Sequence, residues 1–143
     1  TTGEARRPRR VKVTPQEISY SVVIESCSRR GDAQGAAGWL QEMASSPFRP
    51  NVFAFNAVIA GFARKGESRE AASWLDSMIA EGLQPNVVSY TAVIDSCAKA
   101  GDAPGAVRWF ETMLESGVRP NALTYNAVIN SFAVQGDAEG AVR

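Results

Sequence analysis

Apolar residues recur along this chain at the spacing of a helix, in paired runs that a glycine separates. Each run places apolar residues at i, i+3, i+4 and i+7, which share one face of a helix. In the middle of the chain the runs are Phe55, Val58, Ile59 and Phe62, then Ala71, Trp74, Leu75 and Met78. The pattern predicts pairs of amphipathic helices and no strand. The expected helices cover residues 19–30, 33–46, 54–65, 68–81, 89–100, 103–116 and 124–135, and another begins within 138–143.

The paired runs repeat with a period of 35 residues. Several residue types recur at this interval, which chance does not explain. The series are Trp39, Trp74 and Trp109; Met43, Met78 and Met113; Gly31, Gly66, Gly101 and Gly136; Ala36, Ala71, Ala106 and Ala141; and Pro50, Pro85 and Pro120. A fixed period of this length indicates a stack of units rather than one globular core. We expect unit 1 at 17–51, unit 2 at 52–86, unit 3 at 87–121 and a partial unit 4 at 122–143.

A glycine followed by an acidic residue marks the turn inside every unit. Such a pair combines a left-handed helix stop with a side chain that caps the next helix. The pairs are Gly31-Asp32, Gly66-Glu67, Gly101-Asp102 and Gly136-Asp137. Neither helix of a unit can bury its apolar stripe alone, so the units are expected to stack into an all-α solenoid of helix-turn-helix repeats. Because unit 4 stops inside its second helix, we expect the natural protein to continue past Arg143.

Composition argues against most enzyme classes. The 143 residues include no histidine, which excludes Ser/His and Cys/His nucleophile pairs and every zinc site that contains histidine. Cys27 and Cys97 are too few for a disulfide framework, so we expect core thiols in a reducing compartment. No apolar run approaches the length of a membrane span. The sequence therefore predicts no catalytic residue, metal, cofactor or membrane insertion, and any catalytic domain would lie outside this chain.

The charges balance over the whole chain but not along it. Lysine plus arginine and aspartate plus glutamate number 15 each. Residues 1–12 hold five basic residues against one acidic residue. We expect 1–16 to comprise a basic segment, either part of a transit peptide or a linker, and the tail of a preceding repeat. Residues 17–143 then hold 10 basic and 14 acidic residues, a net charge of −4, so any surface for a polyanion must be locally basic.

Unit 3, VVSYTAVIDSCAKAGDAPGAVRWFETMLESGVRPN, closely resembles the pentatricopeptide repeat. The pattern of that family runs V-T-Y-N-x-L-I, a glycine turn, A-x-x-x-F/W-x-x-M and G-x-x-P-D/N, and it recurs here in every unit. The resemblance implies a right-handed superhelix that binds single-stranded RNA, with one base addressed by each repeat. It also implies a mitochondrial or chloroplast location, a role in RNA processing, stability, editing or translation, and no DNA partner.

The fifth residue of each unit points independently to a binding surface. It lies off the apolar stripe of the first helix, yet it is always small and polar: Ser21, Asn56, Thr91 and Asn126. The ninth and thirteenth residues share its face, and in three units the thirteenth is a cation. We expect these cations, Arg29, Arg64 and Lys99, to contact phosphates. The alternative is that Arg29 and Lys99 only pair with Glu25 and Asp95 on a solvated helix face.

The resemblance also assigns roles to two further positions of each unit. The fifth and last residues form the base-reading pair: Ser21 with Asn51, Asn56 with Asn86, and Thr91 with Asn121. The family pattern takes the first and third pairs as adenine and the second as a pyrimidine, mainly cytosine. The second residues, Ile18, Phe53, Val88 and Leu123, would sandwich the bases, although core packing alone would also select apolar residues there.

Two alternatives remain open at this stage. The tryptophan series lies on the second helices beside apolar residues, so we expect Trp39, Trp74 and Trp109 to be core between the repeats rather than a platform for base stacking.

A helical solenoid also serves as a concave docking surface for other proteins in large assemblies. The net charge of −4 over 17–143 favours that scaffold, whereas the polar fifth positions favour RNA.

Overall fold

The computed structural model describes residues 15–140 of the chain, and the surroundings of side chains within residues 20–133. This part consists of helices and turns without a strand, as the sequence predicts. The helices are α2 (Pro15–Arg29), α3 (Ala33–Ala44), α4 (Val52–Arg64), α5 (Ser68–Ala80), α6 (Val87–Lys99), α7 (Ala103–Glu115) and α8 (Ala122–Gly140). The basic segment predicted at 1–12 and the chain end at 141–143 lie outside the described residues.

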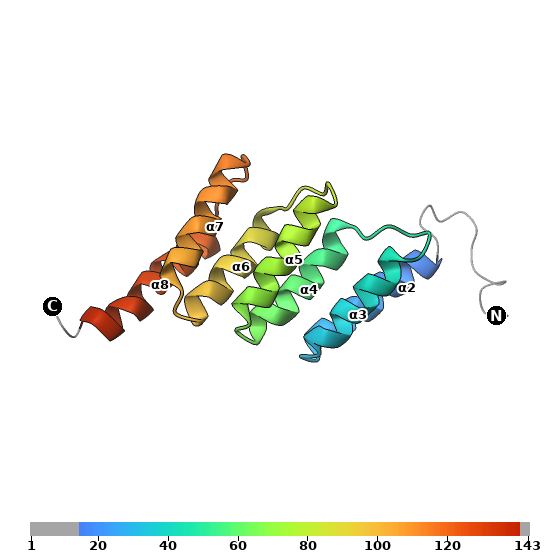
Figure 1. Ribbon diagram of the computed structural model, residues 1–143, viewed down its shortest axis with the longest axis horizontal. Coiled ribbons are helices and arrows are strands. Elements are labelled where there is room, and N and C mark those ends of the chain that lie inside the picture. Colours follow the sequence, from blue (N-terminus) through green and yellow to red (C-terminus); the bar gives the residue numbers. More distant parts are fainter. Residues whose placement is uncertain (1–14, 141–143) are drawn as a thin grey trace.

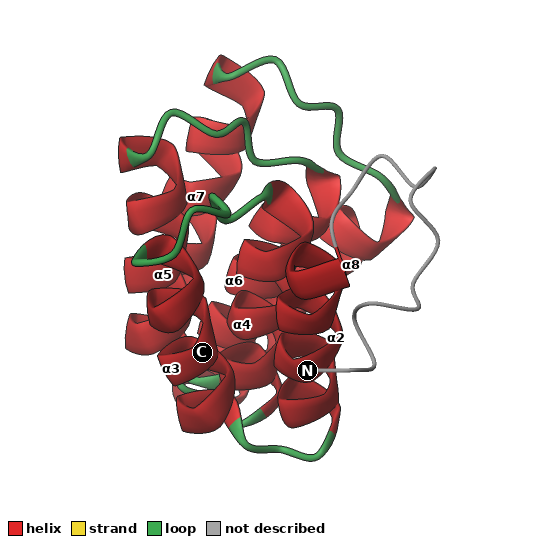
Figure 2. Ribbon diagram, turned by 90° about the vertical axis from the view of Figure 1, so that its right-hand side faces the viewer, coloured by secondary structure: helices red, strands yellow, loops and turns green. Residues whose placement is uncertain are grey.

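The helices form a solenoid of two layers, which Figure 1 shows along its length and Figure 2 from one end. One layer holds the first helices of the units, α2, α4, α6 and α8, and each packs on the next. The other layer holds the second helices, α3, α5 and α7, each packed between two successive first helices. The main contacts therefore join neighbouring units, which confirms the predicted stack.

The turn inside each unit follows the predicted chemistry with one exception. The turn glycines have positive φ angles, at Gly31 (83°), Gly66 (74°) and Gly101 (76°). Asp32 and Asp102 each accept a hydrogen bond from the backbone N–H three residues later, at 2.9 and 3.0 Å. Glu67 makes no such bond. Its side chain is one methylene longer, so the expectation that Glu67 caps α5 is wrong.

The core is a series of aliphatic, aromatic and sulfur-containing side chains between the two layers. The methionines that recur every 35 residues, Met43, Met78 and Met113, are all fully buried. Cys27 and Cys97 are buried free thiols, as expected. Burial raises the pKa of Cys97 to about 11, and the negative charge of Asp102 contributes to the shift. The thiol therefore stays protonated at neutral pH and behaves as an apolar core group.

The tryptophans are less buried than the sequence predicts. Each indole packs against the aromatic side chain at the fourth position of its own unit, with ring centroids 6.2–6.4 Å apart. Trp74 and Trp109 are partly buried against the core. Trp39 is 44% exposed, so its assignment to the core is wrong. It is flanked by Gly35 and Gly38, which have no side-chain atoms to cover the indole.

The last helix differs from the predicted arrangement. The sequence predicts a helix ending at 135, a turn at Gly136 and a new helix, but α8 continues through Gly136 to Gly140. In the other units the turn is stabilised by a second helix that packs back on the first. No second helix follows α8 within the described residues, and the Gly136-Asp137 pair alone does not turn the chain.

Candidate nucleic-acid interface

The apolar second residues of the units lie on the surface and not in the core. Phe53 is 52% exposed, Val88 55% and Leu123 67%. They stand near the starts of three successive first helices, α4, α6 and α8. Core packing therefore does not explain why these positions are apolar. Ile18 belongs to α2, but its side chain lies outside residues 20–133, for which the structure describes side-chain surroundings.

Pockets lie between successive members of this exposed series. The unit-2 pocket is lined by Phe53 and Val88, together with the fifth and last residues of unit 2, Asn56 and Asn86. The unit-3 pocket is lined by Val88 and Leu123, with Thr91 and Asn121 of unit 3. Val88 therefore forms a wall of both pockets. In each pocket the structure brings together two apolar side chains and one predicted base-reading pair.

The last residue of each unit also caps the next first helix. Oδ1 of Asn51 accepts a hydrogen bond from the backbone N–H of Ala54 at 2.9 Å. Asn86 and Asn121 make the same bond to the N–H three residues later, at 3.1 and 3.0 Å. These bonds satisfy backbone donors that the first turn of a helix leaves unpaired. The cap directs Oδ1 toward the helix and leaves Nδ2, an amide donor, for other contacts.

In the unit-2 pocket the two asparagines are joined to each other and to a serine. Asn56 donates through Nδ2 to Oδ1 of Asn86 at 3.1 Å. Oγ of Ser89, the third residue of unit 3, carries one hydrogen and has two possible acceptors: Oδ1 of Asn56, which is the nearer, and Oδ1 of Asn86 at 3.1 Å. The same Oγ accepts from the backbone N–H of Asn86 at 3.1 Å, which completes a capping box on α6. The pair is therefore held in one arrangement by the start of the next unit.

Beside the unit-3 pocket, a threonine takes the position that Ser89 has beside the unit-2 pocket. Oγ1 of Thr124, the third residue of unit 4, lies 2.7 Å from Oγ1 of Thr91. It also donates to Oδ1 of Asn121 at 3.0 Å. Thr91 and Asn121, the predicted pair, are therefore linked through the Thr124 hydroxyl and not directly. Thr124 is fully buried, as is Ser89.

Unit 1 lacks this link. The third residue of unit 2 is Ala54, which has no hydroxyl. Ser21 and Asn51 are both half-buried within the described part of the chain, and no hydrogen bond joins them there. Asn126 of unit 4 is exposed on α8. The three predicted pairs thus differ in how firmly they are positioned.

Two of the predicted phosphate-contacting cations are paired with carboxylates on their own helix. Arg29 lies 2.7 Å from Glu25, and Lys99 lies 3.3 Å from Asp95. All four side chains are at least partly exposed, so each pair contributes only a few tenths of a kcal/mol. These are the pairings that the alternative interpretation of the sequence expects.

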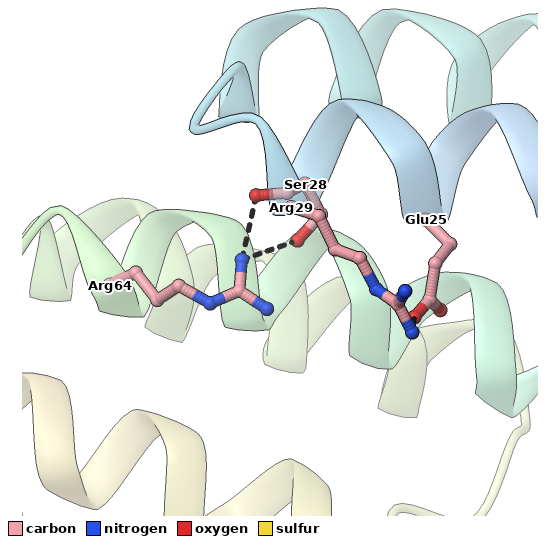
Figure 3. Close-up of polar contacts among 4 residues, drawn as sticks. All are labelled: Glu25, Ser28, Arg29 and Arg64. Carbon is pink, nitrogen blue, oxygen red and sulfur yellow. Dashed lines mark hydrogen bonds and ion pairs between the residues drawn. The ribbon is translucent and has the colours of Figure 1, made fainter.

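Arg64 makes a different contact, shown in Figure 3. Four residues before Arg64 on the same helix stands Ala60, so no carboxylate is available there. Its Nη1 reaches across to α2 and donates to the carbonyl oxygen of Ser28 at 2.6 Å and to Oγ of Ser28 at 3.0 Å. The carbonyl belongs to the last turn of α2 and also accepts a hydrogen bond from the backbone N–H of Gly31 at 3.1 Å. Arg64 therefore joins units 1 and 2.

Sequence reasoning missed three contributors to this surface: Ser28, Ser89 and Thr124. A signal exists for the last two, because they are hydroxyl residues at the third position, on a helix face that is otherwise buried and apolar. Ser28 has no counterpart, since the equivalent residues Ala63 and Ala98 are apolar.

The described residues contain no cluster of three or more histidine, cysteine, aspartate or glutamate side chains that could hold a metal ion. Among the same residues, no helix combines the length and the apolar character needed to cross a membrane.

The fold is similar to solved structures of repeat proteins. PPR10 from maize matches with a TM-score of 0.77 and 25% identity, over 94% of this chain and 20% of that chain. PPR10 in complex with an 18-nt psaJ RNA element matches with a TM-score of 0.74 and 24% identity, over 90% and 21%. Nuclear proteinaceous RNase P 2 from A. thaliana matches with a TM-score of 0.75 and 17% identity, over 92% and 29%. This chain thus spans about a fifth of the length of PPR10.

Sequence families give the same assignment. No curated protein sequence matches the chain. The PPR repeat family matches residues 50–99 and 85–134, and the PPR repeat matches residues 18–48. These matches cover most of the chain and coincide with the stacked helix pairs of the structure. The chain therefore belongs to the pentatricopeptide repeat family.

Proposed function

We propose that this chain binds single-stranded RNA and that each unit addresses one base. The observation that carries the proposal is the pair of successive pockets that share Val88. Each pocket is lined by two exposed apolar side chains and by polar side chains that include one predicted base-reading pair. Apolar walls suit the faces of an unstacked base, and amides or hydroxyls suit its Watson–Crick edge. The similar fold of PPR10 in complex with an RNA element supports the same function.

The base assignment follows the family pattern unit by unit. Units 1, 2 and 3, taken in the parallel orientation, favour 5′-A-C-A-3′, with uracil as the second choice in the middle. Asn56 and Asn86 select the middle base, and Thr91 with Asn121 selects the third. The first base is assigned to Ser21 and Asn51, the pair without a hydroxyl link.

The phosphate contacts are assigned to Arg29, Arg64 and Lys99. Arg64 uses Nη1 for Ser28, and its other guanidinium nitrogens make no hydrogen bond to a described residue, so it can hold α2 and a phosphate together. To contact a phosphate, Arg29 and Lys99 would have to break their ion pairs with the carboxylates of Glu25 and Asp95. Their attraction to RNA is therefore reduced by the bonds that they already make.

Titration of a fluorescently labelled RNA with ACA in a uridine background tests the proposal at two salt concentrations. We expect binding at low salt that weakens as salt rises, with a slope of log K against log[salt] near −2 for three phosphate contacts. An RNA hairpin that pairs the same bases should bind more weakly. Equal binding of the paired and unpaired forms would contradict base recognition, and no binding at low salt would overturn the proposal.

A protein scaffold is the second candidate, favoured by the net charge of −4 over 17–143 and by the carboxylate partners of Arg29 and Lys99. The same titration separates the two functions, because a scaffold gives no salt-dependent RNA binding.

The family resemblance also leads us to propose a mitochondrial or chloroplast location with a role in RNA processing, stability or translation. Imaging of a fluorescent fusion of the full-length protein tests the location.

A further inference from the structure

We propose that the third residue of each following unit sets the hydrogen-bond polarity of the base-reading pair, and so decides between bases of similar size. This inference rests on the proposed RNA-binding function. It concerns Ser89 and Thr124, whose buried hydroxyls hydrogen-bond to the fifth residues of units 2 and 3. It also concerns Ala54, which leaves the pair of unit 1 without such a hydroxyl.

The orientation of the unit-2 pair follows from the start of α6. The backbone N–H of Ser89 can only donate, so Asn86 must turn Oδ1 toward it. Asn56 must then turn Nδ2 toward that oxygen, which leaves its own Oδ1 facing the Ser89 hydroxyl. Each bond therefore fixes the next. Nδ2 of Asn86, Nδ2 of Asn56 and Oδ1 of Asn56 each keep a hydrogen or a lone pair, and we infer that a base meets them in this order.

This order of donor, donor and acceptor complements cytosine. The Watson–Crick edge of cytosine carries two acceptors, O2 and N3, followed by the N4 amino donor, whereas uracil carries an acceptor, a donor and an acceptor. If the Asn56 amide turned over, the pocket would present donor, acceptor and donor, which complements uracil. The hydroxyl of Ser89 opposes this turn by donating to Oδ1 of Asn56. Ser89 is thus a positioning residue that favours cytosine over uracil.

The unit-3 pocket follows the same logic with hydroxyls. Either hydroxyl can donate in the contact between Thr91 and Thr124. In the state in which Thr124 gives its hydrogen to Oδ1 of Asn121, Thr91 donates to Thr124. Thr91 then faces the pocket as an acceptor beside the Nδ2 donor of Asn121. Adenine offers the N1 acceptor and the N6 amino donor that match, whereas guanine offers a donor at N1 and an acceptor at O6. Ser21 in unit 1 has no third-position hydroxyl beside it, because Ala54 stands there, so unit 1 should discriminate less between the two purines.

The test compares bases in one RNA at one position. The 143-residue chain is titrated by NMR at low salt with two RNAs that differ only by cytosine or uracil in the middle. Ser89→Ala is expected to lower the ratio of the two affinities about three- to tenfold, the effect of one hydrogen bond. The side-chain amide protons of Asn56 should shift in the free protein as well. Ser89→Thr retains a hydroxyl and should retain the ratio.

Two further variants separate this effect from general loss of structure. Ser96→Ala removes a buried hydroxyl of α6 that bonds to the Val93 carbonyl oxygen at 2.8 Å, away from the pocket, and should leave the ratio unchanged. Ala54→Ser adds the missing hydroxyl to unit 1 and should raise its preference for adenine over guanine about three- to tenfold.

The outcomes distinguish this inference from the proposed function. RNA binding that prefers cytosine to uracil equally in the native chain and in Ser89→Ala would overturn the inference and leave the function standing. An unchanged purine preference in Ala54→Ser would overturn it as well, even if Ser89→Ala did not fold. Absence of any RNA binding by the native chain would overturn both.

Discussion

The interface between units 1 and 2 is held differently from the two interfaces that follow it. At the first, Arg64 bonds to Ser28 near the C-terminal ends of α2 and α4. At the second and third, hydroxyls bridge the base-reading pairs near the N-terminal ends of the first helices. Neither kind of bond occurs at both places among the described residues. The same helical stack therefore accepts polar contacts at either edge.

Single residues at equivalent positions explain the difference. Arg64 reaches across because Ala60 gives it no carboxylate at i−4, whereas Lys99 has Asp95 there. The first interface lacks a hydroxyl bridge because Ala54 stands where Ser89 and Thr124 stand in later units. The apolar core repeats closely, so these polar positions are where the units acquire individual properties.

The largest effect in this comparison is expected from the tryptophans of units 1 and 2. Trp74→Ala should lower the free energy of unfolding by about 3 kcal/mol, because the indole is partly buried against the core. Trp39→Ala should cost less than half as much, since Trp39 is 44% exposed. Urea denaturation followed by circular dichroism measures both. Equal losses would show that the two units are packed alike.

The cations provide the next comparison. Arg64→Met should lower the free energy of unfolding by about 1.5–3 kcal/mol, the range for hydrogen bonds to a charged group. Lys99→Met is the matched control and should cost about 0.5 kcal/mol or less, because its ion pair is exposed. Urea midpoints report the difference. If both variants were equally stable, Arg64 would not join units 1 and 2.

The third-position hydroxyls should give the smallest change in stability. Ser89→Ala removes a capping box and a bridge and should cost about 0.5–1.5 kcal/mol. Ala54→Ser should stabilise the first interface by a smaller amount, since Asn51 already caps α4. Thermal unfolding of the two variants is the measurement. A loss of stability in both would contradict the equivalence of these positions.

The repeated features of the fold could be predicted from the sequence. The period of 35 residues located the helix pairs, and the glycines at Gly31, Gly66 and Gly101 located the turns. First helices begin two or more residues earlier than predicted, because Asn51, Asn86 and Asn121 cap them. The asparagines were identified only as base-reading residues. Their capping role was missed, although asparagine before an apolar run is a common helix start.

Contacts between units were not predictable in the same way. The Arg64 bond depends on Ser28, which lies 36 residues away in another unit, and on the absence of a carboxylate at Ala60. The hydroxyl bridges depend on how far one first helix is shifted along the next. Neither the reach of Arg64 to Ser28 nor the shift between first helices follows from a pattern within one unit. The exposure of Trp39 and the course of α8 past Gly136 likewise depend on what packs nearby.

Base preference at the middle position after Asn56→Thr tests the central claim most directly. The change makes the unit-2 pair resemble Thr91 and Asn121 and keeps the hydroxyl of Ser89 behind it. We expect the preferred middle base to move from cytosine to adenine, with the salt dependence unchanged. Asn126→Thr is the matched control and should leave the middle base unaffected. RNA binding without any shift on Asn56→Thr would contradict base recognition by this pair.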